Sequence, residues 1–267
     1  MLKGQVLHRV AKFFAAAAFV VALPMTARAE APRCEAPLDL IRFANPLPHL
    51  GQKLADRQPI IIVAIGSSST AGAGASSPQA SYPSRLAVEL KAQFPGHDIT
   101  VLNRGVNGEE AADMVKRFDS AIVAVKPDLV LWQLGTNSVI RDHQIDSSGA
   151  KIHEGLEKIR VAGADVVLID PQFAPKVIVK PEAARMVELI ATTAKEEDVD
   201  LFPRFGVMKR WHDVEHMAFE TFVSPDGLHM NDWSYGCLAK VLGQAIVEAA
   251  KRPVLSAHAL PHMLYPE

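Results

Sequence analysis

A short apolar run at residues 59–65 (PIIIVAI) limits the fold of this chain more than any other feature. The run is continuous, rich in β-branched residues and followed directly by Gly66, which is typical of a strand buried on both faces. Three later runs have the same character, at residues 99–102, 129–134 and 165–169. Aromatic residues make up only 6% of the chain, so small aliphatic side chains must fill the core, as in parallel α/β sheets.

Segments with a helical spacing of apolar residues lie between and after these runs. Strands and helices therefore alternate, which predicts βαβ units and a three-layer α/β/α sandwich around a parallel sheet. We expect one domain over residues 58–267, preceded by a Pro-rich, irregular arm at residues 30–57. The predicted helices cover residues 86–94, 111–125, 148–162, 181–197, 205–218 and 232–251.

The beginning of the chain has the pattern of a secretory signal peptide, residues 1–29. Positive residues precede an apolar stretch at residues 13–25, and Ala27 and Ala29 form an A-x-A cleavage site. An apolar run of 13 residues is too short to cross about 30 Å of hydrocarbon, so we expect no stable membrane span. The sequence predicts a periplasmic or secreted protein.

Removal of this peptide and export have two consequences. The formal net charge changes from −2 to about −6, because residues 1–29 hold four positive and no negative side chains. An acidic chain without a Lys/Arg cluster is a poor candidate for nucleic-acid binding. Cys34 and Cys237 are the two cysteines, and an exported protein often pairs such residues. Two unpaired thiols are the alternative.

Ligands of parallel sheets bind beside the carboxyl ends of the strands, so the loops after the strands are the places to search. The first loop, residues 66–72 (GSSSTAG), puts hydroxyls at a helix start, where backbone N–H groups favour a developing oxyanion. Taken alone, it also fits a turn with a serine capping the helix. The loop lacks the lysine of a P-loop, the last glycine of a G-x-S-x-G elbow and the third glycine of a dinucleotide-binding loop.

Three further loops carry residues suited to the same chemistry. Residues 103–108 (NRGVNG) contain glycines that let the backbone approach a ligand, and Asn137 in the third loop is a neutral donor. Near the C-terminus, Asp226 and His229 are three residues apart, so the carboxylate can orient the imidazole, the usual base for a serine. Each loop taken alone also fits a plain turn or a helix cap.

Together, the four loops resemble the consensus blocks of the SGNH hydrolase (GDSL-like esterase/lipase) family. The resemblance covers residues 60–245 and implies a flavodoxin-like strand order and ester hydrolysis without a metal or organic cofactor. The four matching segments, in the family's order, are GSSS at 66–69, an Asn and a Gly five apart at 103–108, GTNS at 135–138 and DGLH at 226–229.

The resemblance gives each candidate residue a role. Ser68 is the nucleophile, His229 is its base, and Asp226 orients the imidazole. The backbone N–H groups of Ser68 and Gly108 and the side chain of Asn137 form the oxyanion hole. No residue of this set is a metal ligand.

The function expected from these residues is that of an exported serine esterase, acting on a small-molecule or polysaccharide ester of a short acyl group, acetyl first. Alternatives on the same scaffold are a lipolytic esterase, thioesterase or lysophospholipase, an O-acetyltransferase, and a degenerate polysaccharide-binding protein. Two departures leave room for altered activity, because Ser67 and Ser138 stand where the family has Asp. We interpret both as variation in residues that support the site.

Several other residues allow both a functional and a structural interpretation. His212 and His216 are spaced like two zinc ligands, but Asp213 stands where a metalloprotease needs Glu, which favours structural or surface histidines. We expect Trp132 to lie in the core rather than to bind substrate. Three charged residues flank the oxyanion glycine and either touch substrate or form a solvated rim, which we favour: Arg104, Glu109 and Glu110.

Overall fold

The computed structural model describes Met1, residues 33–143 and residues 145–253. Apart from Met1, the predicted signal peptide lies outside the described residues. The described residues from Arg33 onward belong to one unit. Within that part of the chain, no helix has the length and apolar character needed to cross a bilayer.

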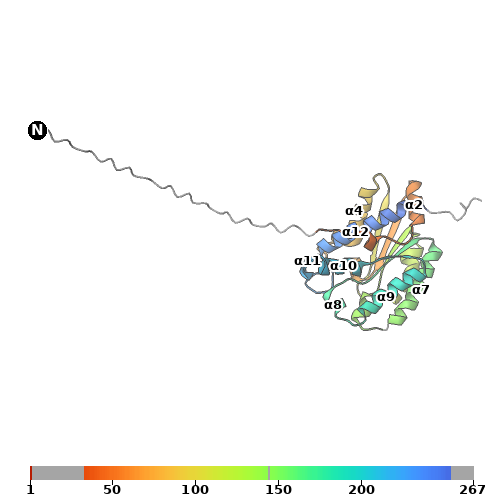
Figure 1. The fold of residues 1–267 in the computed structure, drawn as a ribbon. Helices are drawn as coiled ribbons and strands as arrows, with labels where there is room; N and C mark the ends of the chain where they lie inside the picture. The colour runs from red at the N-terminus through yellow and green to blue at the C-terminus, as the bar shows by residue number, and fades with distance from the viewer. Residues whose placement is uncertain (2–32, 144, 254–267) are drawn as a thin grey trace, which may run out of the picture. The chain divides into compact units, whose positions relative to one another are not determined.

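The central sheet has five parallel strands in the order β2-β1-β3-β4-β5 (Figure 1). This is the flavodoxin-like order, so the prediction of an α/β fold with such a sheet is confirmed. All four predicted apolar runs form strands, and the fifth strand is an addition to the prediction. The bounds are β1 (Ile60–Gly66), β2 (Ile99–Gly105), β3 (Leu129–Gln133), β4 (Asp165–Ile169) and β5 (Asp200–Phe202).

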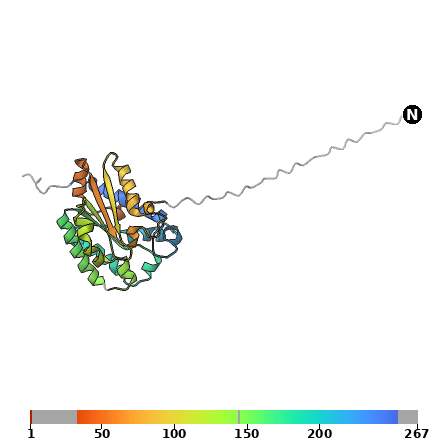
Figure 2. The ribbon, with the colours of Figure 1, turned by 180° about the vertical axis from the view of Figure 1, so that it is seen from behind.

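Helices cover both faces of the sheet (Figures 1 and 2). On one face α4 packs against α12, and on the other α7 packs against α5 and α9. The helices are α1 (Leu38–Ile41), α2 (Pro48–Ala55), α3 (Ser68–Ala71), α4 (Tyr82–Gln93), α5 (Ala111–Lys116), α6 (Thr136–Ile140), α7 (Ile145–Ala162), α8 (Pro175–Ile178), α9 (Ala183–Glu196), α10 (Arg204–Asp213), α11 (Phe219–Phe222) and α12 (Asp232–Lys251).

The segment at residues 30–57, expected to be irregular, contains α1 and α2 in its described part. Phe43 and Leu50 from this segment are buried in the same core as the sheet. Asp165, at the start of β4, accepts hydrogen bonds from the backbone N–H groups of His49 (3.3 Å) and Leu50 (2.9 Å) in the first turn of α2. This carboxylate caps the helix and joins the segment to the sheet.

Two predicted helices are shorter than their apolar spacing suggested. The segment at 111–125 divides into α5 and a separate π-helical turn, Asp119–Val123. The segment at 205–218 remains helical only to Asp213, and His216 has a positive φ of 55°. His212 and His216 therefore do not share one helix face. Among the described residues, no cluster of His, Cys, Asp or Glu could hold a metal ion.

Trp132 of β3 lies in the core, as expected. Its side chain is fully buried and packs edge-on against Phe118, with ring centroids 4.9 Å apart. A Cβ atom on Gly155 of α7 would come within 2.2 Å of the Trp132 ring. The glycine thus lets α7 lie close to the sheet behind the candidate site.

A disulfide bond joins Cys34 to Cys237 of α12, across 203 residues of sequence. Their Cα atoms are 5.2 Å apart, a normal separation for a disulfide. The pairing favoured from the sequence is therefore present. It fastens the segment before α1 to the last helix, which packs on α4.

We expect removal of this bond to lower the thermal stability of the protein. Reducing a bond that closes so long a loop costs about 2–5 kcal/mol, or roughly 5–15 °C in Tm for a domain of this size. Calorimetry of the Cys34→Ser/Cys237→Ser double variant tests this. Wild-type protein treated with a reductant is the control and is expected to show the same shift, because the folded contacts differ only at the sulfur atoms. An unchanged Tm in both would contradict a stabilising role.

Candidate active site

The residues selected from the sequence meet at the carboxyl ends of β1, β2 and β3. Ser68 begins α3 directly after β1, and Gly72 ends that helix in a left-handed conformation (φ 101°). Asn103 lies near the end of β2, where its side chain donates to the carbonyl of Thr70 (2.8 Å) and accepts from the N–H of Gly105 (2.9 Å). The second loop is thereby tied to the turn that carries Ser68.

The side chains of Ser68, His229 and Asp226 form a continuous hydrogen-bonded chain. Ser68 Oγ lies 2.8 Å from His229 Nε2, and His229 Nδ1 lies 2.5 Å from Asp226 Oδ2. The imidazole is largely buried, with 17% of its side chain exposed, whereas 42% of the Asp226 side chain is exposed. This arrangement can take the proton of the serine hydroxyl and hold the resulting imidazolium.

Asp226 is itself held in place by the backbone. Its Oδ1 accepts hydrogen bonds from the N–H groups of Leu228 and His229, both at 2.9 Å. Burial raises the pKa of Asp226, but the hydrogen bonds from the His229 ring and from these two N–H groups outweigh it and leave the pKa below its ordinary value. The carboxylate therefore stays ionised at neutral pH, as an orienting partner for the imidazole must.

The turn under Ser68 is organised by the side chain of Gln133 at the end of β3. Its Oε1 accepts from the N–H of Ser67 (2.9 Å), from Ser67 Oγ (2.9 Å) and from Ser69 Oγ (3.1 Å). A Cβ on Gly66 would lie within 2.9 Å of that oxygen, so glycine is needed there. Ser67, the first departure from the family pattern, is thus a buried donor to a neutral acceptor.

A fully buried arginine supports the same turn from α10. Arg204 Nη1 donates to Ser69 Oγ (2.8 Å), and its Nε donates to the backbone carbonyl of Asp170 after β4 (2.9 Å). These supporting roles of Arg204 and Gln133 were not predicted from the sequence. No motif marks them, since both act by contact between segments distant in the chain.

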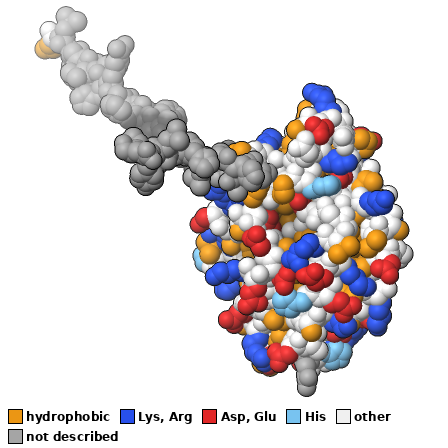
Figure 3. Space-filling view, turned by 90° about the vertical axis from the view of Figure 1, so that its right-hand side faces the viewer, with side chains coloured by type: hydrophobic (Ala, Val, Ile, Leu, Met, Phe, Trp, Pro, Cys, Tyr) orange, Lys and Arg blue, Asp and Glu red, His pale blue; other side chains and the backbone are white. Residues whose placement is uncertain are grey.

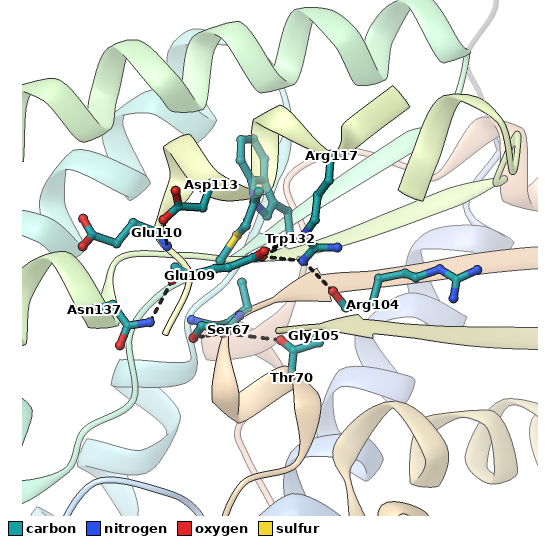
Figure 4. A network of polar contacts seen from close by, with 12 residues as sticks. Ser67, Thr70, Arg104, Gly105, Glu109, Glu110, Asp113, Arg117, Trp132 and Asn137 are labelled. Atoms are coloured by element: carbon teal, nitrogen blue, oxygen red, sulfur yellow. Dashed lines mark hydrogen bonds and ion pairs between the residues drawn. The ribbon is translucent and has the colours of Figure 1, made fainter. Parts of the chain in front are cut away.

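The candidate oxyanion donors lie on the next two loops. Gly108 has a left-handed backbone conformation (φ 80°), which favours glycine. Asn137 Nδ2 donates to the backbone carbonyl of Glu109 (2.8 Å), and Figure 4 shows the side chain directed toward that residue. The second hydrogen on this nitrogen remains for an oxyanion. Asn137 is thereby fixed relative to the loop of Gly108.

Ser138, the second departure from the family pattern, faces a carboxylate from another loop. Its Oγ donates to Glu110 Oε2 (2.9 Å). Glu109, the preceding residue, forms an ion pair with Arg117 (2.6 Å), which also donates to the carbonyl of Arg104 (2.7 Å; Figure 4). Glu109 and Glu110 are thus engaged in a network of ion pairs and hydrogen bonds. The prediction that they belong to a solvated rim around Gly108 is therefore wrong for these two residues.

A cavity of about 330 Å³ adjoins the loop that carries Asp226, lined by Pro175, Phe219, Glu220, Val223, Ser224, Pro225, Gly227 and Asn231. His212 stacks on Phe219 with ring centroids 4.4 Å apart and pairs with Asp213. Figure 3 shows one face of the molecule on which acidic and basic side chains are interspersed.

Known proteins of similar sequence are esterases. A protein named arylesterase from Vibrio mimicus is 25% identical over 169 residues, which is 63% of this chain and 79% of that protein. A protein named acetylxylan esterase from Geobacillus stearothermophilus is 34% identical, but over only 21% of this chain and 26% of its own length.

Solved structures show the same fold. A two-domain esterase active on acetylated mannans gives a TM-score of 0.66 at 18% identity, over 79% of this chain and 56% of that one. A mutant of an acetyl-xylooligosaccharide esterase from Geobacillus gives a TM-score of 0.61 at 19% identity. The match covers 70% of this chain and 94% of that one. The structure of TesA gives a TM-score of 0.60 at 22% identity, over 71% of this chain and 99% of that one. Residues 33–252 match the model of the non-GDSL lipase-like family. This match and the esterase folds above confirm the resemblance found in the sequence, and the chain belongs to the non-GDSL lipase-like family.

Proposed function

We propose that this protein is an exported serine esterase that removes a small acyl group from a carbohydrate or a similar ester. Acetyl is the acyl group we favour. The observation that carries the proposal is the alignment of Ser68 Oγ, the His229 ring and the Asp226 carboxylate within hydrogen-bond distance. The acetyl group is suggested by the relatives, because two of them are named for acetylated xylan or mannan.

The reaction follows from the order of the three side chains: with the Asp226 carboxylate at Nδ1, His229 presents Nε2 to Ser68 Oγ as an acceptor. His229 Nε2 takes the proton of Ser68 as Oγ bonds to the ester carbonyl carbon. The tetrahedral intermediate then collapses, the C–O bond to the alcohol breaks, and the alcohol leaves with the proton held on Nε2. A water molecule, deprotonated by the same nitrogen, attacks the acyl-enzyme and releases the acid and free Ser68.

Negative charge on the carbonyl oxygen is to be held by the N–H groups of Ser68 and Gly108 and by Asn137 Nδ2. Preorganised donors of this kind typically contribute about 10²–10³ in rate each. The bond from Asn137 to the Glu109 carbonyl supports this assignment, because it fixes the amide before the substrate arrives. Ser68 begins a helix, where its N–H has no partner within the helix.

Export is supported by two independent features. The predicted signal peptide at residues 1–29 would direct the chain out of the cytoplasm. The Cys34–Cys237 bond is of a kind that persists in oxidising compartments such as the periplasm or the exterior.

The proposal predicts hydrolysis of p-nitrophenyl acetate, with rates that fall as the acyl chain lengthens to decanoate. A fluorophosphonate probe is expected to label the protein once, on the tryptic peptide containing Ser68, because the alkoxide attacks phosphorus as it attacks a carbonyl. Mass spectrometry locates the label, and heat-denatured protein is the control.

Other outcomes select the alternatives. A preference for longer acyl chains would replace the proposal with a lipolytic esterase, thioesterase or lysophospholipase. Transfer of acetyl to a sugar hydroxyl in excess of hydrolysis would indicate an O-acetyltransferase. If the probe does not label the protein and no ester is turned over, the polysaccharide-binding protein is the alternative that remains.

A further inference from the structure

Arg141 lies directly beside both candidate oxyanion loops. It follows the last residue of α6, and its backbone N–H donates to the carbonyl of Asn137 one turn earlier (3.0 Å). Its guanidinium reaches the other loop, since a Cβ built on Gly108 would lie 3.2 Å from Arg141 Nη2. A cationic group thus borders the position where the scissile carbonyl is to bind.

The guanidinium is held there by Glu110. Glu110 Oε1 accepts from Arg141 Nη1 (2.8 Å), while Oε2 bonds to Ser138 Oγ (2.9 Å) and lies 3.0 Å from His143 Nδ1. Burial raises the pKa of Glu110, but the hydrogen bonds from His143, Arg141 and Ser138 outweigh it and lower the pKa. An ionised Glu110 therefore fixes one edge of the guanidinium.

The other edge of Arg141 is open. Within residues 33–143 and 145–253, its Nε and Nη2 form no hydrogen bond, and 44% of the side chain is exposed. Nε and Nη2 form one side of the guanidinium, the side that binds carboxylates and phosphates through two parallel hydrogen bonds. The contact with Glu110 leaves that side unoccupied.

A second cation near the site lacks a side-chain partner among the described residues. Lys176 of α8 lies beside the catalytic loop, with its Cγ 3.9 Å from a Cβ built on Gly227. Arg104, at the end of β2, is also exposed, but its guanidinium extends away from Asn137 and Ser67 (Figure 4). The neighbouring carboxylates, by contrast, are engaged. Glu109 pairs with Arg117, Glu110 with Arg141, Asp226 with His229, and Asp113, which lies within electrostatic reach of Arg141, with Lys116.

We propose that Arg141 binds an anionic group, a carboxylate or a phosphate, next to the scissile ester. The natural substrate is then an acyl ester of an acidic compound, such as a uronate or a sugar phosphate, rather than of a neutral sugar. The inference rests on the proposed function, because it concerns the specificity of the site around Ser68. It assigns Arg141 to substrate binding and Glu110 to positioning Arg141.

Three small aryl acetates that differ in one meta substituent test this: 3-acetoxybenzoate, its neutral isostere 3-acetoxybenzamide, and 3-acetoxyphenyl phosphate. We expect wild type to favour an anionic ester in kcat/KM. Arg141→Gln is expected to lower kcat/KM for that ester about tenfold, mainly through KM, and to change the amide by less than twofold. Arg141→Lys should retain part of the preference. Loss on the carboxylate alone or the phosphate alone identifies which group is bound.

The matched control is Lys91→Gln, which removes one exposed positive charge from α4 and is expected to change none of the three rates. An equal loss on all three esters in Arg141→Gln would overturn the inference, because Arg141 would then act only on the oxyanion loop. So would equal rates on charged and neutral esters in wild type. Failure of wild type to cleave any of the esters would instead overturn the proposed function.

Discussion

Replacing Ser68 by alanine is expected to lower kcat for p-nitrophenyl acetate by about 10⁶-fold, to the background of the remaining site. The nucleophile is lost, and no second hydroxyl can replace it, because the neighbouring Ser67 and Ser69 point to Gln133. Folding should be unaffected, since the partner of Ser68 Oγ is the His229 ring, which water can also reach. Initial rates and a thermal melt on the same preparation test both statements.

Ser69→Ala is the matched control, one residue further along the turn. This change removes the acceptor of the buried Arg204 Nη1, so it should cost about 1–3 kcal/mol of stability. It leaves the nucleophile in place, and activity should remain measurable at temperatures below the melt. Activity surviving in Ser68→Ala but lost in Ser69→Ala would show that the wrong serine has been assigned.

Asp226→Asn is expected to lower kcat at neutral pH by about 10⁴-fold while keeping the shape of the loop. The asparagine oxygen can still accept from the N–H groups of Leu228 and His229. Its amide nitrogen would then face His229 Nδ1 as a donor, in place of the carboxylate oxygen. The imidazole would turn to the tautomer with hydrogen on Nε2, which cannot take the proton of Ser68.

Steady-state kinetics of Asp226→Asn, together with a thermal melt, measure this effect. The matched control is Asp213→Asn, because Asp213 also pairs with a histidine, His212 (2.8 Å), but outside the hydrogen-bonded chain to Ser68. The control should keep wild-type activity. A fall of less than tenfold in Asp226→Asn would mean that Asp226 does not set the tautomer.

The sequence predicts the parts of this fold whose apolar pattern is local and continuous. The four long strands and α12, at residues 232–251, are cases of this kind. The strand β5 was not predicted, because it has only three residues and begins with a charged residue, Asp200. The Asp200 side chain accepts a hydrogen bond from the N–H of Asn45 (2.9 Å). Burial raises the pKa of Asp200 to about 6, a sign of tertiary context that no local pattern carries.

Prolines misled the prediction for residues 30–57. Pro48 occupies the first turn of α2, where a missing N–H costs nothing because the helix leaves those groups unpaired in any case. The same rule could have indicated a helix start. For α10, the apolar spacing continues past Asp213 although the helix ends there, so the predicted helix was too long.

In the candidate site, too, some residues could be predicted from the sequence and others could not. Ser68, Asp226 and His229 stand in recognisable motifs, and the structure brings them within hydrogen-bond distance. Their supporting partners do not stand in motifs. Gln133 and Arg204 reach the nucleophile turn from β3 and α10, so only the assembled fold reveals what they do.

The Cys34–Cys237 bond closes residues 34–237 into a covalent ring. The ring contains all five strands and every candidate catalytic residue from Ser68 to His229. A single cut by a protease within residues 34–237 would open the ring without separating the pieces. An enzyme working among extracellular proteases would thus keep its serine and its histidine on one molecule after such a nick.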